Sequence, residues 1–154
     1  MPALTVRNPQ ALKDLAGKEI GVSDWLAVTQ ERIEQFAEAT EDRQWIHVDS
    51  KRARTESPFG TTIAHGFLTL SLVSHFMKEV IRVESGVRMA INYGLNRVRF
   101  PAPLRAGCKI RARVGLLAYK ELPDSIEATF SITIEGEQPG KPNCVAEWIV
   151  RYYS

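Results

Sequence analysis

Residues 64–81 restrict the fold of this chain more than any other segment. The spacing of their side chains predicts a helix, and apolar residues occupy almost every face of it. The apolar positions are Phe67, Leu68, Leu70, Leu72, Val73, Phe76, Met77 and Val80. A helix that is apolar nearly all round must be covered on most sides by other parts of the protein. In a chain of 154 residues, a curved β-sheet is the most economical cover.

The second half of the chain contains strands for such a sheet. Four β-rich segments follow the predicted helix, at residues 88–100, 109–122, 125–135 and 144–153. Proline and glycine residues between them predict short turns, and consecutive strands joined by short turns pair antiparallel. We therefore predict an α+β hot-dog fold, in which an antiparallel β-sheet wraps around a long central α-helix. No repeat or linker divides residues 1–154, so we expect a single domain.

The first half of the chain is expected to be mixed. Residues 9–15 favour a short helix, and residues 18–28 are typical of a first strand. Thr29 is a good N-cap for a following helix. The buried face of that helix is predicted to carry Ile33, Phe36, Ala37 and Thr40. Residues 42–50 break the helical period and are expected to form a loop or a single turn.

The charge of the chain argues against nucleic acid as a partner. The formal net charge is +2, and the basic residues are scattered along the sequence. Their one cluster, Lys51, Arg52 and Arg54, is followed by Glu56. This cluster either faces solvent or contacts a phosphate-bearing cofactor.

Several features favour the cytoplasm over a membrane or secreted location. Residues 1–5 lack the basic and apolar regions of a signal peptide, and residues 66–80 are too short and too polar to span a bilayer. Cys108 and Cys144 match no metal-binding spacing and are expected to be small buried side chains rather than a disulfide. A reducing compartment fits this pattern.

Asp42 and His47 are the strongest candidates for chemistry. They lie five residues apart in an irregular segment, where a loop can turn both side chains toward one point. Histidine, with an unperturbed pKa of about 6.5, can take or give a proton near neutral pH. A nearby carboxylate can hold and polarise the same water or substrate hydroxyl. The alternative is structural: Asp42 caps a turn and His47 packs under Trp45.

Residues at and after the start of the central helix could shape a site. The backbone amide of Gly66 lies at the positive end of the helix dipole, where it could stabilise a developing enolate oxygen. Alternatively, Gly66 permits close packing of helix and sheet. His65 either caps the helix or shapes the site. Ser74 stands where an apolar residue is expected and could instead bond its own helix backbone, and His75 is expected on the surface.

Together these residues resemble the MaoC-like dehydratase family, which includes the R-specific enoyl-CoA hydratases. The family motif Asp-x-Asn-Pro-Leu/Ile-His is matched by Asp42, Ile46 and His47. A hydrophobic–His-Gly–hydrophobic motif is matched by residues 63–68, and residues 92–101 resemble the family's strand after the helix. Three positions depart from the family's pattern: Glu41 replaces the glycine often found before the aspartate, Gln44 stands for asparagine and Trp45 for proline. The resulting segment, residues 40–47, is similar to the branch of the family related to nodulation protein N.

The resemblance implies reversible syn addition of water to a trans-2-enoyl thioester, giving an (R)-3-hydroxyacyl product. It implies that Asp42 and His47 are the catalytic acid–base pair and that the Gly66 N–H binds the thioester oxygen. Further substrate contacts are expected from His65, Ser74 and Asn96. No metal is expected, and no cofactor beyond the coenzyme A of an acyl-CoA substrate. A homodimer is expected, because resembling proteins pair two units and a single sheet has edges to cover.

Two other functions are compatible with the same fold. A hot-dog thioesterase would place a catalytic carboxylate on or near the central helix, where the only acid is Glu79 at the far end. A non-catalytic acyl-thioester-binding subunit would have no need of Asp42 or His47.

Overall fold

The computed structural model describes residues 2–154. In chain order its elements are β1 (Leu4–Val6), the 3₁₀ helix η1 (Pro9–Leu15), β2 (Lys18–Val22), β3 (Leu26–Ala27), α1 (Gln30–Thr40), α2 (Trp45–Val48), α3 (Ser50–Glu56), α4 (Gly66–Ser71), α5 (Val73–Val80), β4 (Ile81–Val83), β5 (Met89–Arg99), β6 (Lys109–Glu121), β7 (Ser125–Gly136) and β8 (Cys144–Tyr153). The predicted α+β class is confirmed, and the four strands expected in the second half are β5 to β8.

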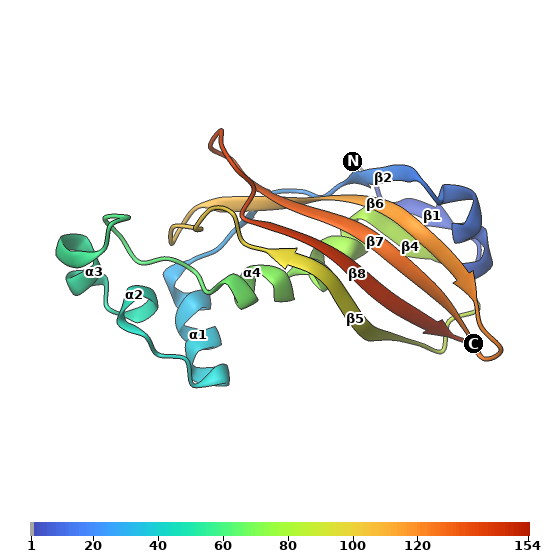
Figure 1. Cartoon of the computed structure of the whole chain (residues 1–154), viewed down its shortest axis with the longest axis horizontal. Helices are drawn as coiled ribbons and strands as arrows, with labels where there is room; N and C mark the ends of the chain where they lie inside the picture. The colour runs from blue at the N-terminus through green and yellow to red at the C-terminus, as the bar shows by residue number, and fades with distance from the viewer. Residues whose placement is uncertain (1) are drawn as a thin grey trace.

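One antiparallel sheet of six strands forms the larger layer. Its strands run in the order β2–β6–β7–β8–β5, and β3 also pairs with β6. The sheet arches over α4 and its continuation, while α1, α2 and α3 gather beyond one end of it (Figure 1). This is the predicted hot-dog arrangement. No helix among residues 2–154 has the length and apolarity needed to cross a bilayer.

The core lies between the concave face of the sheet and helices α4 and α5. Alternate residues of β6, β7 and β8 are buried, as the period of two in a strand requires. Phe76 of α5 and Phe130 of β7 are the largest fully buried side chains. Burial of each contributes about 1.5–3 kcal/mol. Residues that precede α4 are therefore attached to a firmly packed helix.

The predicted central helix differs from the observed one in two respects. The segment expected over residues 64–81 is divided at Leu72 into α4 and α5. The Leu72 N–H is shared between the carbonyls of Leu68 and Thr69, at 3.2 and 3.3 Å, which tightens the helix locally. In addition, Phe67 is 69% exposed, so the chain alone does not cover the helix on every side.

The strand prediction for the N-terminal half was partly wrong. Residues 18–28 form two strands, β2 and β3, rather than one. Between them, the Ser23 N–H still donates to the Ala112 carbonyl of β6 at 2.9 Å, but the Ala112 N–H is accepted by the Ser23 hydroxyl, at 2.8 Å, in place of a backbone carbonyl. The parallel pair of β1 with β4 was not predicted, since strands of three residues carry too little periodicity to detect.

Glu41 ends helix α1 in the left-handed conformation, with φ 61° and ψ 18°. Helices commonly end on a glycine in this conformation. This backbone conformation explains why glycine is often found at this position in the family that the motif resembles. A residue with a Cβ pays about 1–2 kcal/mol for the same turn.

Glu41→Gly is expected to raise the free energy of unfolding by about 0.5–1 kcal/mol. Glycine removes the strain of the left-handed conformation, about 1–2 kcal/mol. This gain exceeds the stability lost because glycine has more conformational entropy in the unfolded chain, about 0.4–1 kcal/mol. The melting temperature should rise by about 1–4 °C, as measured by calorimetry. Glu41→Ala is the matched control, because it removes the carboxylate but leaves a Cβ in the turn. Equal gains from both variants would show that the carboxylate, not the backbone, is responsible.

Candidate active site

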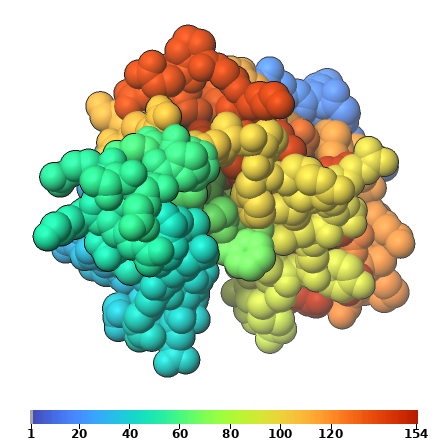
Figure 2. Space-filling model, turned by 60° about the vertical axis from the view of Figure 1, so that its left-hand side comes forward, coloured from blue at the N-terminus to red at the C-terminus, as the bar shows by residue number. Residues whose placement is uncertain are grey.

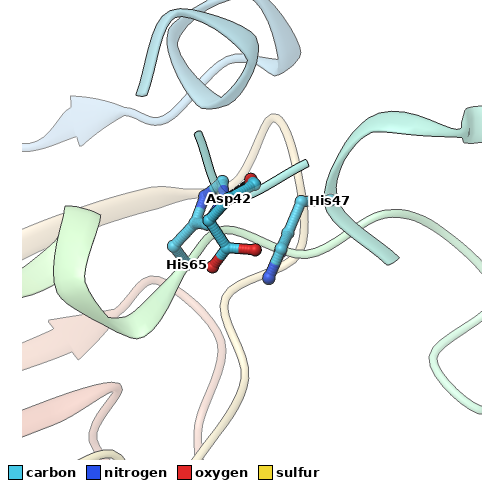
Figure 3. Close-up of side chains that lie close together, drawn as sticks. All are labelled: Asp42, His47 and His65. Atoms are coloured by element: carbon cyan, nitrogen blue, oxygen red, sulfur yellow. Dashed lines mark hydrogen bonds between the residues drawn. The ribbon is translucent and has the colours of Figure 1, made fainter. Parts of the chain in front are cut away.

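The predicted catalytic residues meet where α1, α2 and the segment before α4 come together. Asp42 follows the end of α1, His47 lies on the single turn α2, and His65 directly precedes α4. Figure 3 shows the three side chains gathered at one point. One ligand-type atom of each lies within 4.8 Å of the others. The structure thus places Asp42 and His47 together, as predicted.

His47 is fixed by hydrogen bonds to its side chain and to its backbone. Its Nδ1 lies 2.7 Å from the carbonyl oxygen of Ile63. A carbonyl can only accept, so Nδ1 carries the proton of the neutral ring and Nε2 keeps a free lone pair. The Gln30 side-chain amide donates to the His47 carbonyl at 2.8 Å. The Ile63 N–H donates to the carbonyl of Ile46 at 3.0 Å, which binds α2 to the segment before α4.

The environment of His47 favours its neutral form. Burial of the ring is the main effect, and it lowers the pKa of His47 below its usual 6.5. The neighbouring His65 lowers this pKa further, whereas the Ile63 carbonyl and the Asp42 carboxylate act in the opposite direction. A neutral imidazole with a free Nε2 is equipped to take a proton near neutral pH.

The arrangement of the two rings does not suit a metal ion. His47 and His65 are stacked, with ring centroids 3.8 Å apart and 23° between the planes. Lone pairs in stacked rings point side by side, whereas metal ligands converge on one centre. His47 Nδ1 and His65 Nε2 also already face carbonyl oxygens. We assign no metal to this group.

Asp42 and His47 open into a cavity of about 440 Å³. Its lining consists of Phe36, Thr40, Asp42, His47, His65, Gly66, Phe67 and Phe100. Figure 2 shows the hollow between the α1–α3 region and the yellow β5 region, with the light-green start of the α4 region at its floor. Polar groups therefore meet an aromatic wall, as in many small-molecule sites.

Gly66 contributes to this cavity with its backbone, and the ring of Phe100 packs against it. A Cβ added at Gly66 would lie 3.1 Å from that ring, closer than ordinary contact. The N–H of Gly66 has no hydrogen-bond partner within residues 2–154. Close packing and an available amide are thus both present at Gly66. The methyl of an alanine would press on Phe100 rather than enter open space.

The structure does not bring the other two expected substrate contacts to this cavity. Ser74 lines neighbouring cavities between α5 and strands β5 and β8, together with Asn92 and Trp148. Asn96 is exposed on β5, where it pairs with Glu147 of β8. His65 does line the cavity, although it is only 3% exposed.

Four residues that line the cavity, three of them aromatic, were not predicted as site residues. Phe36 and Thr40 were expected only as part of the buried face of α1. Their spacing of four residues does place them on one helix face, but nothing local shows what that face contacts. Phe67 and Phe100 lie close together, with ring centroids 6.0 Å apart. They are distant in sequence, so no local sequence pattern indicates that they meet.

His75 and Cys144 follow the predictions, whereas Cys108, expected to be buried, is only half-buried. His75 is exposed and lies 3.3 Å from the Glu79 carboxylate. Cys108 and Cys144 are both free thiols. Burial raises the pKa of the Cys144 thiol to about 11, so this side chain stays protonated at neutral pH.

Known proteins are similar to this chain in sequence and in fold. The family described as MaoC like domain matches residues 12–136. The 3-hydroxyacyl-thioester dehydratase Z of Mycobacterium tuberculosis is 50% identical, over 96% of this chain and 99% of that protein. Nodulation protein N of Rhizobium leguminosarum bv. viciae is 44% identical, over 86% of this chain and 83% of that protein. A solved (R)-hydratase from A. caviae, involved in PHA biosynthesis, has a TM-score of 0.68 and 25% identity, over 88% of this chain and 98% of that chain. The chain therefore belongs to the MaoC-like dehydratase family and is a lyase of the hydratase–dehydratase class.

Proposed function

We propose that the protein catalyses the reversible hydration of a trans-2-enoyl-CoA, or a related acyl thioester, to the (R)-3-hydroxyacyl thioester. The observation that carries this proposal is the pairing of the Asp42 carboxylate with His47 Nε2 on the wall of one cavity. A carboxylate oxygen of Asp42 and a ring nitrogen of His47 lie within 4.8 Å of each other, and Nδ1 of His47 is already engaged with the Ile63 carbonyl. A water bridging two acceptors at about 2.7–3.0 Å each spans a gap of this size.

Hydration then follows from the tautomer of His47. Nε2 takes a proton from the bound water, while Asp42 accepts the other hydrogen bond and orients the water oxygen. That oxygen bonds to the β-carbon as the double-bond electrons move toward the thioester carbonyl. The resulting enolate oxygen is held by the Gly66 N–H. His47 returns its proton to the α-carbon, so both groups add from the same face and His47 is neutral again. Dehydration is the reverse.

This scheme needs no cofactor, since each proton moves between water, His47 and substrate. Coenzyme A serves as the handle of the substrate. The thioesterase alternative gains no support from α5: the Glu79 carboxylate interacts with His75 and accepts the Asp24 N–H at 3.0 Å. We place the reaction in the cytoplasm, where the free thiols of Cys108 and Cys144 would stay reduced.

We further propose a homodimer formed along β5. This strand ends the sheet, and Met89, Ile91 and Leu95 are 41%, 45% and 43% exposed. An unpaired strand edge with exposed apolar side chains needs cover. Two-fold pairing of β5 with its copy would continue the sheet across both chains. Light scattering should give twice the chain mass of 17.3 kDa; a stable monomer at micromolar concentration would contradict this.

Asp42→Asn and His47→Asn should each lower kcat for crotonyl-CoA hydration by about 10²–10⁴-fold. Asparagine at position 47 removes Nε2 but keeps an amide N–H that can donate to the Ile63 carbonyl, so the local fold should persist. Loss of enoyl absorbance measures hydration, and release of free coenzyme A in the same samples measures hydrolysis. Circular dichroism checks that each variant is folded.

His75→Asn is the matched control and should retain full activity, because His75 is exposed and outside the cavity. If Asp42→Asn or His47→Asn kept nearly full activity, the substituted residue would have no part in proton transfer or in orienting the water. Release of coenzyme A by the wild-type protein would identify a thioesterase. Binding of crotonyl-CoA without any turnover would identify a non-catalytic subunit.

Gly66→Pro and Gly66→Ala together test the amide donor. Gly66 is the first residue of α4, where proline is tolerated because the helix does not use that N–H. His65, with φ −60° and ψ 137°, already has the conformation favoured before proline. Both variants add a Cβ against Phe100, but only proline removes the N–H. Turnover of Gly66→Pro should be lower than that of Gly66→Ala by about 10²–10³-fold. Equal turnover of the two variants would disprove the role of the Gly66 amide. A fall in melting temperature of the same size in both variants would be due to the added Cβ against Phe100, not to loss of the N–H.

A further inference from the structure

His65 is enclosed by the residues that form the proposed active site. Its ring is stacked on that of His47, and the Phe36 ring packs against it at a centroid distance of 4.9 Å, tilted by 56°. Its Nε2 lies 2.9 Å from the backbone carbonyl oxygen of Asp42. Because that oxygen only accepts, Nε2 must carry the ring proton. One side chain therefore contacts both Asp42 and His47.

Asp42 has few other restraints. It directly follows the left-handed residue Glu41 and is itself exposed. The Gln44 N–H approaches its carboxylate only at 3.5 Å, at the limit of a hydrogen bond. Within residues 2–154, the bond from His65 is thus the one short hydrogen bond made by Asp42. The main chain that carries the carboxylate is held chiefly by this imidazole.

The polar atoms of His65 are not available to a substrate. Nε2 is engaged with Asp42, and Nδ1 is buried with no hydrogen-bond partner among residues 2–154. An unpaired buried acceptor lowers stability, so this nitrogen does not account for a histidine at position 65. The donor function of Nε2 does account for it.

We propose that His65 is a positioning residue: its Nε2–H fixes the main chain of Asp42 while its ring face fixes the plane of His47, so that both groups address one water. This inference rests on the proposed hydration reaction and assigns His65 a role other than contact with substrate. Residues that orient catalytic groups typically affect the rate by about 10–100-fold, since small displacements weaken the reaction geometry.

Three substitutions separate the two contacts. The amide nitrogen of glutamine reaches about as far as Nε2, that of asparagine only about as far as Nδ1, and phenylalanine keeps the stacked ring without a donor. His65→Gln keeps the donor to the Asp42 carbonyl but lacks the ring that packs on His47, so it should lose the least kcat of the three variants. His65→Asn and His65→Phe should lose about 10–100-fold in kcat for crotonyl-CoA, with KM unchanged. His65→Phe should also keep or raise the melting temperature, because it removes the unpaired Nδ1. His75→Phe, on the exposed face of α5, is the control and should match the wild type in kcat.

Other outcomes would overturn the proposal. A raised KM with unchanged kcat would show that His65 contacts substrate. Equal loss in all three variants, or a lower melting temperature with unchanged turnover per folded molecule, would show a purely structural role. Substrate-free crystal structures of the variants give a readout that needs no activity. The Asp42 carboxylate should move away from His47 Nε2 in His65→Phe and stay in place in His65→Gln. If the Asp42 carboxylate behaves in this way in both variants but the wild-type protein hydrates no enoyl thioester, the proposed function is wrong and the positioning role of His65 still holds.

Discussion

The hydrogen bond from His47 Nδ1 to the Ile63 carbonyl is the contact on which the rest of the site depends. At 2.7 Å it fixes the tautomer and the plane of the ring, and so leaves Nε2 as the proton acceptor. The same residue, Ile63, donates its N–H to Ile46. The turn that carries His47 is therefore bound to the segment before α4 through both side chain and backbone. Proton transfer by His47 is a consequence of this attachment as much as of the imidazole itself.

The sheet and the central helix hold that segment in place. The Ala64 N–H donates to the Leu104 carbonyl at 2.8 Å, and the Ala106 N–H donates to the Thr62 carbonyl at 3.0 Å. Residues 62–64 thus lie beside the chain that leads into β6, and α4 begins immediately afterwards. The cavity forms where the apolar core ends and these polar groups begin. Partial burial there strengthens electrostatic interactions that water would otherwise weaken.

The parts of the structure that could be predicted from sequence are those with local signals. Period-two strands, the Thr29 cap and the apolar helix face depend on neighbouring residues, and Asp42 and His47 lie only five residues apart in one short segment. The contacts of His65 with Asp42, and of Phe100 with Gly66, join segments that are distant in sequence. The spacing of residues along the chain therefore cannot predict them. Ser74 shows the same limit: its unusual place on the helix was recognised, but periodicity cannot tell which cavity that face lines. Glu41 was identified as a departure from the related motif, and only its backbone conformation shows what the departure costs.

The pH dependence of kcat/KM for enoyl thioester hydration tests the central claim most directly. The account requires a neutral His47, and burial lowers its pKa below the usual 6.5. Activity should fall as the pH drops and His47 is protonated, with the half-point of this acid limb below pH 6.5. The limb should be absent from the residual activity of His47→Asn. A half-point above pH 6.5, or the same limb in the variant, would contradict the assignment of His47 as the proton acceptor.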